Sequence, residues 1–470
     1  MPRRAAPFLL LLAVVVAAGC GGATQEAAGL PESASLAPAD ALVYATVTTD
    51  EGSDQWQRAE SLLARIPGAR DGLTDAIASA LTDEGLTWDD DVAPALGPEV
   101  VVVVTQSHRT VVLTQPDSDT ALEALLAKGD RKVVTEDVSG WSAVAERASD
   151  LTAYRAALEQ GTLPDVDAFA DGFDTLPEEG LARVWVDAAS LSKDLGAALE
   201  EASSELDLGL EWLAAAVSAE DDGLLATIGI QAPGGADTSY EPELFRRVPA
   251  DAVAALSFGG TQAILERIEG GVDVEGVSAR IEQLTGISLD GLVDGLSGEG
   301  ALYVRRGGAT PEVTLALDPP DPDKTWETLD RAVRKLADAM DTTVGTATEN
   351  GIEVRRLSGD DVTVSYARLD DDTLIATTGA EGIRVFTSDD DKLVDTDAFT
   401  RAAEDVELEE RTKGFVYVDV DGLLALIDEL SNTAVPPDAR EPIESLDSFV
   451  LQASGEGDTT RVSGFVRVDG

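Results

Sequence analysis

Apolar and polar residues alternate along the chain in two distinct patterns. Runs of five to eight residues, alternating or wholly apolar and rich in valine and threonine, predict β-strands, for example Val100–Thr105 and Thr110–Thr114. Only four residues separate these two runs, so they predict an antiparallel hairpin, because a parallel pair needs a long crossover. Elsewhere apolar positions three or four apart predict amphipathic helices, as in Thr325–Met340.

The order of these elements predicts an α+β fold, because strands follow one another across short turns and helices come between strand pairs. We expect two duplicated domains, each a mostly antiparallel twisted sheet with helices packed on one face.

The expected duplication rests on stretches of the first half that recur in the second half in the same order. Such long units exclude the 20–50-residue repeats of solenoids. The second half is predicted to contain an extra hairpin, Val362–Tyr366 with Leu374–Thr378. The matched stretches are Pro38–Val47 with Pro249–Phe258, Gln55–Ile66 with Thr261–Ile268, Gly85–Asp89 with Gly286–Asp290, Val100–Thr105 with Ala301–Arg305, Pro116–Asp119 with Pro320–Asp323, Leu163–Phe169 with Leu393–Phe399, and Val184–Asp187 with Val416–Asp419. Each half is then expected to end in a strand pair, Trp212–Ser218 with Leu224–Gln231 in the first and Ser448–Ala453 with Arg461–Val468 in the second.

The first twenty residues resemble a bacterial lipoprotein signal peptide. Arg3 and Arg4 precede the apolar run Phe8–Ala17, which is too short for a comfortable membrane span, and small residues lead to Cys20, the only cysteine. The resemblance implies cleavage between Gly19 and Cys20 and diacylglycerol on the Cys20 thiol, although leucine is commoner than alanine at position 17. Two alternatives remain: an ordinary signal peptide with an incidental cysteine, and a cytoplasmic protein with an apolar start.

These observations predict five segments. Residues 1–19 are the signal peptide, 20–37 a flexible tether, 38–232 the first α+β repeat, 233–245 a linker and 246–470 the second repeat. We expect the chain to be extracytoplasmic, anchored by lipid to the outer face of the cytoplasmic membrane.

Charge narrows the range of partners. The 470 residues contain 89 Asp and Glu against 34 Lys and Arg, a formal net charge of −55. Such a field repels nucleic acid and anionic headgroups. The charge is interpreted as keeping the protein soluble, as an adaptation to a saline habitat, or as binding cations. The aspartate runs 89–91, 370–372 and 389–391 lack the glycine and distal glutamate spacing of a calcium loop.

The chemistry of a catalytic site is not visible in the sequence. His108, the only histidine, falls in a predicted hairpin turn beside Ser107, and with Cys20 lipidated there is no ligand set for zinc or haem. No phosphate-binding loop is present. A carboxylate pair for glycoside hydrolysis cannot be distinguished among so many acidic residues. We therefore predict no catalytic residues, no metal and no cofactor, and a protein that is not an enzyme.

Four aspartates are weak candidates for a cation site repeated in each half: Asp117, Asp119, Asp321 and Asp323. The alternative, favoured because a helical pattern follows at once, is helix capping by carboxylates that accept free N–H groups. Asp187 and Asp419 are expected to cap helices in the same way. The repeated aromatic pair Trp185 and Tyr417 is interpreted as core, with a carbohydrate or lipid platform as the alternative.

Three stretches resemble an uncharacterised bacterial family, domain of unknown function 3352: Pro38–Asp50 (PADALVYATVTTD), Asp91–Glu99 (DVAPALGPE) and the region of Asp167–Phe169. The resemblance extends over nearly the whole mature chain. It implies a secreted or lipid-anchored protein with no assigned activity, and it transfers no functional residues.

Three functions are compatible with the sequence. The first is a non-catalytic envelope lipoprotein that binds an envelope protein or small ligand, or acts as a scaffold. The second is a hydrolase of envelope polysaccharide or peptide, which requires two carboxylates about 5–10 Å apart in a cleft. The third is a carrier of lipid or small ligands, which requires an apolar cavity.

Overall fold

The computed structural model describes residues 29–82, 85–129, 132–199, 209–233, 238–260, 295–307, 310–339, 341–349, 351–359, 363–379, 381–430 and 436–469. The chain divides into two units. Unit 1 is made of Met1–Gly234, Glu441–Ser445 and Asp458–Gly470, and unit 2 of Gly235–Arg440 and Leu446–Gly457.

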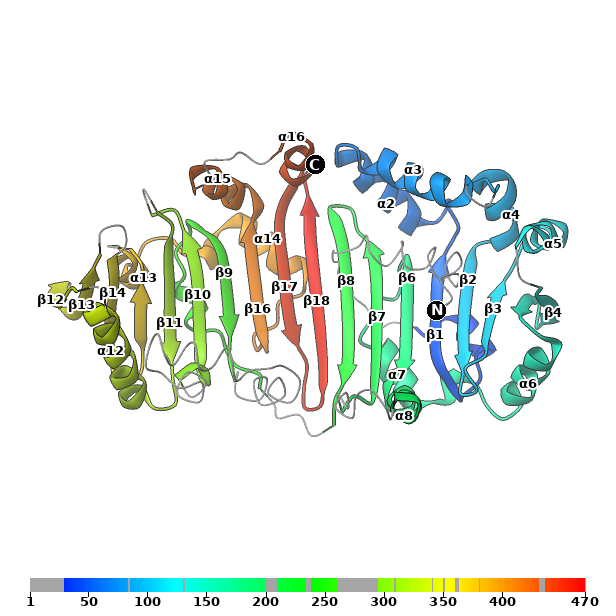
Figure 1. The fold of residues 1–470 in the computed structure, drawn as a ribbon, viewed down its shortest axis with the longest axis horizontal. Coiled ribbons are helices and arrows are strands. Elements are labelled where there is room, and N and C mark those ends of the chain that lie inside the picture. The colour runs from blue at the N-terminus through cyan, green and yellow to red at the C-terminus, as the bar shows by residue number, and fades with distance from the viewer. Residues whose placement is uncertain are drawn as a thin grey trace. The chain divides into compact units, whose positions relative to one another are not determined.

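Unit 1 contains an antiparallel sheet in the order β4–β5–β3–β2–β1–β6–β7–β8–β18 (Figure 1). Its last strand comes from the C-terminus of the chain, whereas the sequence placed that segment in the second repeat. The reason is long-range pairing, since β18 pairs with β8 along nine residues. The strands are β1 (Ala41–Thr48), β2 (Glu99–Thr105), β3 (Thr110–Thr114), β4 (Val134–Val138), β5 (Trp141–Ala145), β6 (Ala182–Asp187), β7 (Trp212–Ala219), β8 (Gly223–Gln231) and β18 (Thr459–Val468).

Helices connect these strands. The expected helix at Gln55–Ile66 is present as α2, one residue earlier, with Ser53 as its N-cap. The helical segments are η1 (Glu32–Leu36), α2 (Asp54–Arg65), α3 (Ala69–Thr82), η2 (Trp88–Val92), α4 (Ala93–Leu96), α5 (Asp119–Lys128), α6 (Ala148–Leu158), η3 (Leu163–Asp165), α7 (Asp167–Phe173) and α8 (Ala188–Leu199).

Unit 2 contains an antiparallel sheet in the order β12–β13–β14–β15–β11–β10–β9–β16–β17. Its strands are β9 (Ala252–Phe258), β10 (Glu299–Arg305), β11 (Glu312–Asp318), β12 (Val344–Glu349), β13 (Ile352–Ser358), β14 (Thr363–Arg368), β15 (Leu374–Thr377), β16 (Gly414–Asp419) and β17 (Leu446–Ser454). Its helical segments are η4 (Phe245–Arg247), α12 (Pro322–Ala339), α13 (Gly382–Thr387), η5 (Leu393–Asp395), α14 (Asp397–Asp405) and α15 (Val420–Leu430), while α16 (Pro437–Glu444) spans residues of both units.

The mixed α and β composition and the antiparallel pairing confirm that part of the predicted fold. The prediction of helices on one face only is wrong. In unit 1, Val111 and Leu113 of β3 pack with residues of α6 and α7, whereas Val112, which points to the opposite face, packs with residues of α3 and α5. The cause is visible in β2, where five consecutive valines make both faces apolar and require cover on both.

The two sheets share an order of six strands: β5–β3–β2–β1–β6–β7 in unit 1 and β15–β11–β10–β9–β16–β17 in unit 2. Both also need a glycine before the second strand. A Cβ atom on Gly97 would lie 1.8 Å from the carbonyl oxygen of Gln115, and one on Gly298 would lie 1.8 Å from that of Asp318. No other residue type fits such a close approach of two backbones.

The extra hairpin of unit 2 is not the predicted one. The hairpin β14–β15 joins β11 through β15, as β4–β5 joins β3 through β5, so these two hairpins correspond. The additional pair in unit 2 is β12–β13. Strand β4, which turns into β5 at Ser139 and Gly140, both with positive φ, was not predicted from the sequence.

Part of the expected tether belongs to the folded unit. Residues 32–36 form the 3₁₀ helix η1, in which Ser33, Ala34 and Leu36 are buried. Ala34 and Leu36 pack in the same core as Tyr44 and Phe169. The segment was predicted to be flexible because it contains few apolar residues, but Ala34 and Leu36 are enough to hold it against the core.

The repeated aromatic residues lie in the cores, as expected. Trp185 and Tyr417 are each 2% exposed. Trp185 contacts Phe169, and Tyr417 contacts Phe399, edge to face in both units with ring centroids 5.5 Å apart. No helix in the described part of the chain is long and apolar enough to cross a membrane.

Candidate functional site

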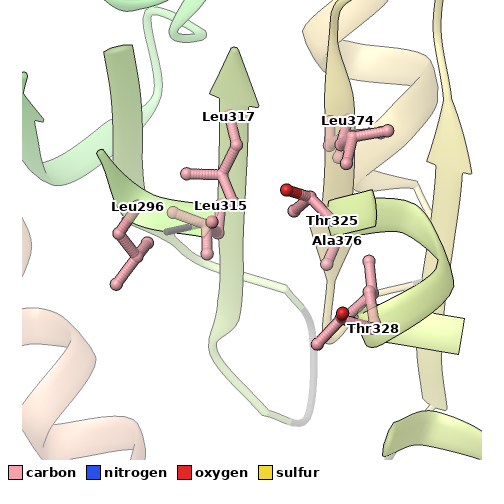
Figure 2. Close-up of a pocket in the computed structure, with 10 residues that line it drawn as sticks. Leu296, Leu315, Leu317, Thr325, Thr328, Leu374 and Ala376 are labelled. Atoms are coloured by element: carbon pink, nitrogen blue, oxygen red, sulfur yellow. The ribbon is translucent and has the colours of Figure 1, made fainter. Parts of the chain in front are cut away.

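An apolar pocket of about 120 Å³ lies in unit 2 between α12 and the strands β11 and β15. Figure 2 shows Leu315 and Leu317 on one side, and Thr325 and Thr328 of the helix on the other. Its lining consists of Gly295, Leu296, Leu315, Leu317, Thr325, Thr328, Leu329, Leu374, Ile375 and Ala376.

Strand register sets the sheet side of the pocket. Leu315 of β11 pairs with Ala376 of β15, and Leu317 pairs with Leu374. Paired residues on neighbouring strands point to the same face, so these four side chains form one apolar patch.

Helix α12 forms the other wall. Asp321 begins the helix, because its Oδ1 accepts a hydrogen bond of 3.0 Å from the backbone N–H of Lys324. Leu329 then contacts both the pocket and the cluster around Val333, Leu357 and Tyr366 that holds the helix on the sheet.

A polar clamp fixes α12 in this position. The carboxylate of Asp330 accepts hydrogen bonds from Tyr366 Oη at 2.7 Å and from Arg334 Nε at 2.8 Å, and it pairs with Arg355 Nη1 at 2.5 Å. Although burial alone would raise it, these partners lower the pKa of Asp330 to about 2. The guanidinium of Arg355 also lies 4.9 Å from the ring centre of Trp326. The wall is therefore held beside the pocket by strong contacts outside it.

The chemistry of the pocket is that of an apolar binding site. Among the lining residues that the structure describes, the only polar side chains are the hydroxyls of Thr325 and Thr328, and none has an ionisable group. Its volume is of the same order as that of the engineered cavity of roughly 150 Å³, lined by Leu, Ile and Phe, that binds benzene or xenon, but this pocket is partly open to solvent. Such a site can hold a few methylene groups or a small ring, and its described lining offers no general acid or base.

The corresponding place in unit 1 is filled. Val112 of β3 and Leu125 of α5 pack there with Leu96, and Leu81 and Val92 complete the cluster. Although six strands follow the same order in the two sheets, side chains fill in unit 1 the place where unit 2 has its pocket. The residues that precede β10 in unit 2, numbers 261–294, lie outside the described residues.

The four aspartate candidates do not come together. Asp321 caps α12, which confirms the capping interpretation there, and Asp323 pairs with Arg368 at 2.8 Å while its side chain stays 87% exposed. In unit 1, Asp119 lies in the first turn of α5, whose N-cap Ser118 makes no capping bond with its side chain. Across the described residues, no three His, Cys, Asp or Glu side chains form a group that could hold a metal ion.

Two further aspartates act as caps. Asp187 Oδ1 accepts from the N–H of Ser190 at 2.8 Å, and Asp419 Oδ1 accepts from the N–H of Gly422 at 3.0 Å. These bonds confirm the predicted caps of α8 and α15. His108 lies in the turn between β2 and β3 with φ of 53°, as the hairpin prediction implied. Gly19 and Cys20, the predicted cleavage and lipidation positions, lie outside the described residues.

A half-buried glutamate begins the second strand of each unit, and neither was predicted from the sequence. In unit 1, Glu99 Oε1 accepts from Ser33 Oγ at 3.2 Å. In unit 2, Glu299 Oε1 accepts from the N–H of Leu244 at 2.5 Å. Both partners precede the first strand of their unit, so each carboxylate ties that entry segment to the sheet.

Stability should depend on pH through Glu299. Burial raises its pKa to about 7, the N–H of Leu244 offsets part of this rise, and the nearby Asp318 and Glu243 add to it. Between about pH 4.5 and about pH 7, Glu299 therefore holds a proton in the folded state that it has lost in the unfolded state. The stabilisation is complete below that window and is lost as the pH rises through it.

Glu299→Gln should remove this dependence. As the pH rises from 5 to 8, the free energy of unfolding of the variant should increase by about 1–2 kcal/mol relative to that of wild type. The full pKa shift would give roughly 3 kcal/mol, which solvent screening reduces. Urea unfolding at both pH values measures the difference. Glu327→Gln, at an exposed position of α12, is the control. Equal slopes for wild type and Glu299→Gln would contradict the assignment.

Comparison with known proteins gives a family and no activity. A family model described as "Protein of unknown function (DUF3352)" matches residues 156–468. Of the three stretches that carried the resemblance, the region of Asp167–Phe169 lies within this match, and Pro38–Asp50 and Asp91–Glu99 lie before it. No curated protein matches the sequence.

Among solved structures, two crystal forms of TP0453 are matched at low similarity. Form IV is 11% identical, with 47% of this chain and 91% of that chain covered and a TM-score of 0.24. Form III is 12% identical, with 50% and 95% covered and a TM-score of 0.25. At such scores the likeness carries no conclusion about fold or function.

Proposed function

Because this chain belongs to the DUF3352 family of proteins of unknown function, we propose that it is a non-catalytic binding protein of the cell envelope. In this proposal Cys20 carries the lipid that anchors the chain outside the cytoplasmic membrane, and unit 2 takes an apolar ligand in the α12 pocket. The two units are proposed to descend from one duplicated domain, which their common order of six strands and the matched Gly97 and Gly298 support.

The observation that carries the proposal is the chemistry of the pocket lining. Eight of its ten residues are aliphatic or glycine, and the other two are threonines. Burying an apolar group there gains about 25 cal/mol for each Å² of apolar surface removed from water. A charged ligand would lose its hydration without finding a partner.

Hydrolysis of a glycoside by a carboxylate pair has less support. That chemistry requires an acid and a base or nucleophile on either side of the bond that is cut. No aspartate or glutamate lines the described pocket. The geometry of unit 2 therefore favours binding.

A pocket-filling variant tests the function. Thr328→Phe places a ring in the pocket, because Thr328 lines it from α12. We expect the affinity for an uncharged monoacylglycerol with an eight-carbon chain to fall at least tenfold, since the ligand and the ring compete for the same volume. Isothermal titration calorimetry on the purified Cys20→Ser chain, which lacks its own acyl groups, measures the affinity.

The matched control is Glu327→Phe on the same helix. Glu327 is exposed and does not line the pocket, so its ring adds apolar surface without filling the cavity. We expect its affinity to stay within about twofold of wild type. Equal losses in the two variants, or no binding to wild type, would argue against an apolar site in the pocket.

A further inference from the structure

Two residues that line the pocket belong to a row of apolar side chains that crosses unit 2. Leu315 and Ala376, which line the pocket, are paired across β11 and β15. From Leu315 the register continues strand by strand to β17, and every partner is aliphatic. The apolar row consists of Ala376, Leu315, Leu302, Leu256, Val416 and Leu451.

All six side chains of the apolar row are half-buried. The row contains no charged or hydrogen-bonding side chain, and six strands at about 4.8 Å spacing make it about 24 Å long. One leaflet of a bilayer has about 15 Å of hydrocarbon, half of the roughly 30 Å core. The row is therefore long enough for a complete acyl chain.

The shape and chemistry of the site distinguish an acyl chain from a peptide. A helix is about 10–12 Å across, whereas the pocket of about 120 Å³ holds a few methylene groups. An extended peptide would bring polar N–H and C=O groups against side chains that cannot satisfy them. An acyl chain has no such groups.

Charge at the pocket decides which end of the ligand enters it. Asp318 follows Leu317 directly at the end of β11, and Asp370 and Asp372 lie in the turn before Leu374. Burial, and then the negative charges of Asp372 and Asp370, raise the pKa of Asp318, so the three carboxylates lie near enough to repel one another. An anionic head group would be repelled there, and an uncharged polar head group would meet a described lining that is apolar apart from two threonines, so the methyl end fits the pocket better.

We propose that unit 2 binds one long acyl chain of an uncharged amphiphile, with its methyl end in the α12 pocket and its length along the apolar row toward β17. This inference rests on the proposed function and adds the class of ligand. The pocket holds the last few methylene groups of the chain, and the apolar row contacts the remaining ones.

Chain length is the direct test. Dissociation constants are measured on the purified Cys20→Ser chain for monoacylglycerols with 8, 12 and 16 carbons, each below the concentration at which it aggregates. A methylene on a half-buried surface tightens binding about twofold, half of the full burial term. We therefore expect about fifteenfold tighter binding for each four carbons.

Variants in the row separate it from the pocket. Leu256→Asn, in the middle of the row and away from the pocket, should weaken the sixteen-carbon ligand at least tenfold and leave the eight-carbon ligand within about twofold. Val416→Thr keeps the shape of the side chain and should act in the same direction with less effect on folding. Ile228→Asn, at a 38% exposed position of β8 in unit 1, is the control and should change neither affinity.

The outcomes separate the inference about the acyl chain from the proposed function, which is binding of an apolar ligand in the pocket. If the eight-carbon ligand binds and longer chains bind no tighter, the apolar row is not the path of the ligand, while the pocket function stands. If no monoacylglycerol binds, because another part of the chain occupies the pocket or because the site is not one for lipid, both proposals fail.

Discussion

Replacing Glu312 by alanine should lower the free energy of unfolding by about 3–5 kcal/mol, because it leaves the charge of a buried arginine without its main partner. Glu312 Oε1 pairs with Arg305 Nε at 2.6 Å, and the two side chains are 3% and 10% exposed. Arg305 Nη1 retains Asp251 at 2.8 Å, but the carboxylate of Asp251 is largely in solvent. Urea unfolding measures the loss.

A double replacement tests whether the loss comes from the stranded charge. Arg305→Met combined with Glu312→Leu removes both charges and fills a similar volume, and it should lie within about 1–2 kcal/mol of wild type. Glu353→Ala, which removes an exposed partner of Arg355, should cost less than about 1 kcal/mol. If Glu312→Ala were as mild as Glu353→Ala, the ion pair would not be buried as described.

Cys20→Ser should move the protein from the membrane fraction to the soluble fraction, the largest change in location that a single substitution can cause here. Serine lacks the thiol that accepts diacylglycerol. Stable anchoring takes two or more acyl chains, at about 0.8 kcal/mol for each buried CH₂. Fractionation of cells grown with an alkyne-labelled fatty acid measures both location and acylation, and we expect the membrane-bound share to fall at least tenfold.

The control for this prediction is Ala17→Leu. This change introduces the residue that is commoner at this position in lipoprotein signal peptides, and it should leave the acylation of Cys20 unchanged. Should Cys20→Ser still be labelled and remain in the membrane fraction, the lipoprotein interpretation would be wrong.

Features determined by neighbouring residues were predictable from the sequence. Asp187 and Asp419 each stand between an apolar strand and a helical pattern, and each caps the helix that follows. The hairpin of β2 and β3 was equally local. The pair β12–β13 could have been found as well, because Asn350–Gly351 between two strand-like runs is typical of a two-residue hairpin turn.

Features that depend on distant segments were not predictable. The pairing of β18 with β8 joins residues about 230 positions apart in the chain, as Thr459 and Gln231 illustrate. A prediction of helices on one face followed from alternating strands, but the valine run of β2 indicates two covered faces.

The candidate site is the least visible part in the sequence. Its lining comes from four separate stretches, and leucines in strands are more often core than ligand contacts. Glu299 in Leu-Ser-Gly-Glu is typical of an exposed turn, and only the fold shows that it meets the N–H of Leu244. Of the four aspartates considered for a cation site, Asp321 caps a helix and Asp323 makes a surface ion pair.

The central claim is that the α12 pocket of unit 2 holds an apolar ligand. The most direct test is mass spectrometry of the molecules extracted from the protein after purification from its own cells. Two proteins are compared at equal amounts, the Cys20→Ser chain and the same chain with the additional change Thr328→Phe. The account predicts an acyl-chain amphiphile with wild-type unit 2 and at least a tenfold smaller yield with Thr328→Phe. Equal yields from the two proteins, or no apolar molecule from either, would contradict it.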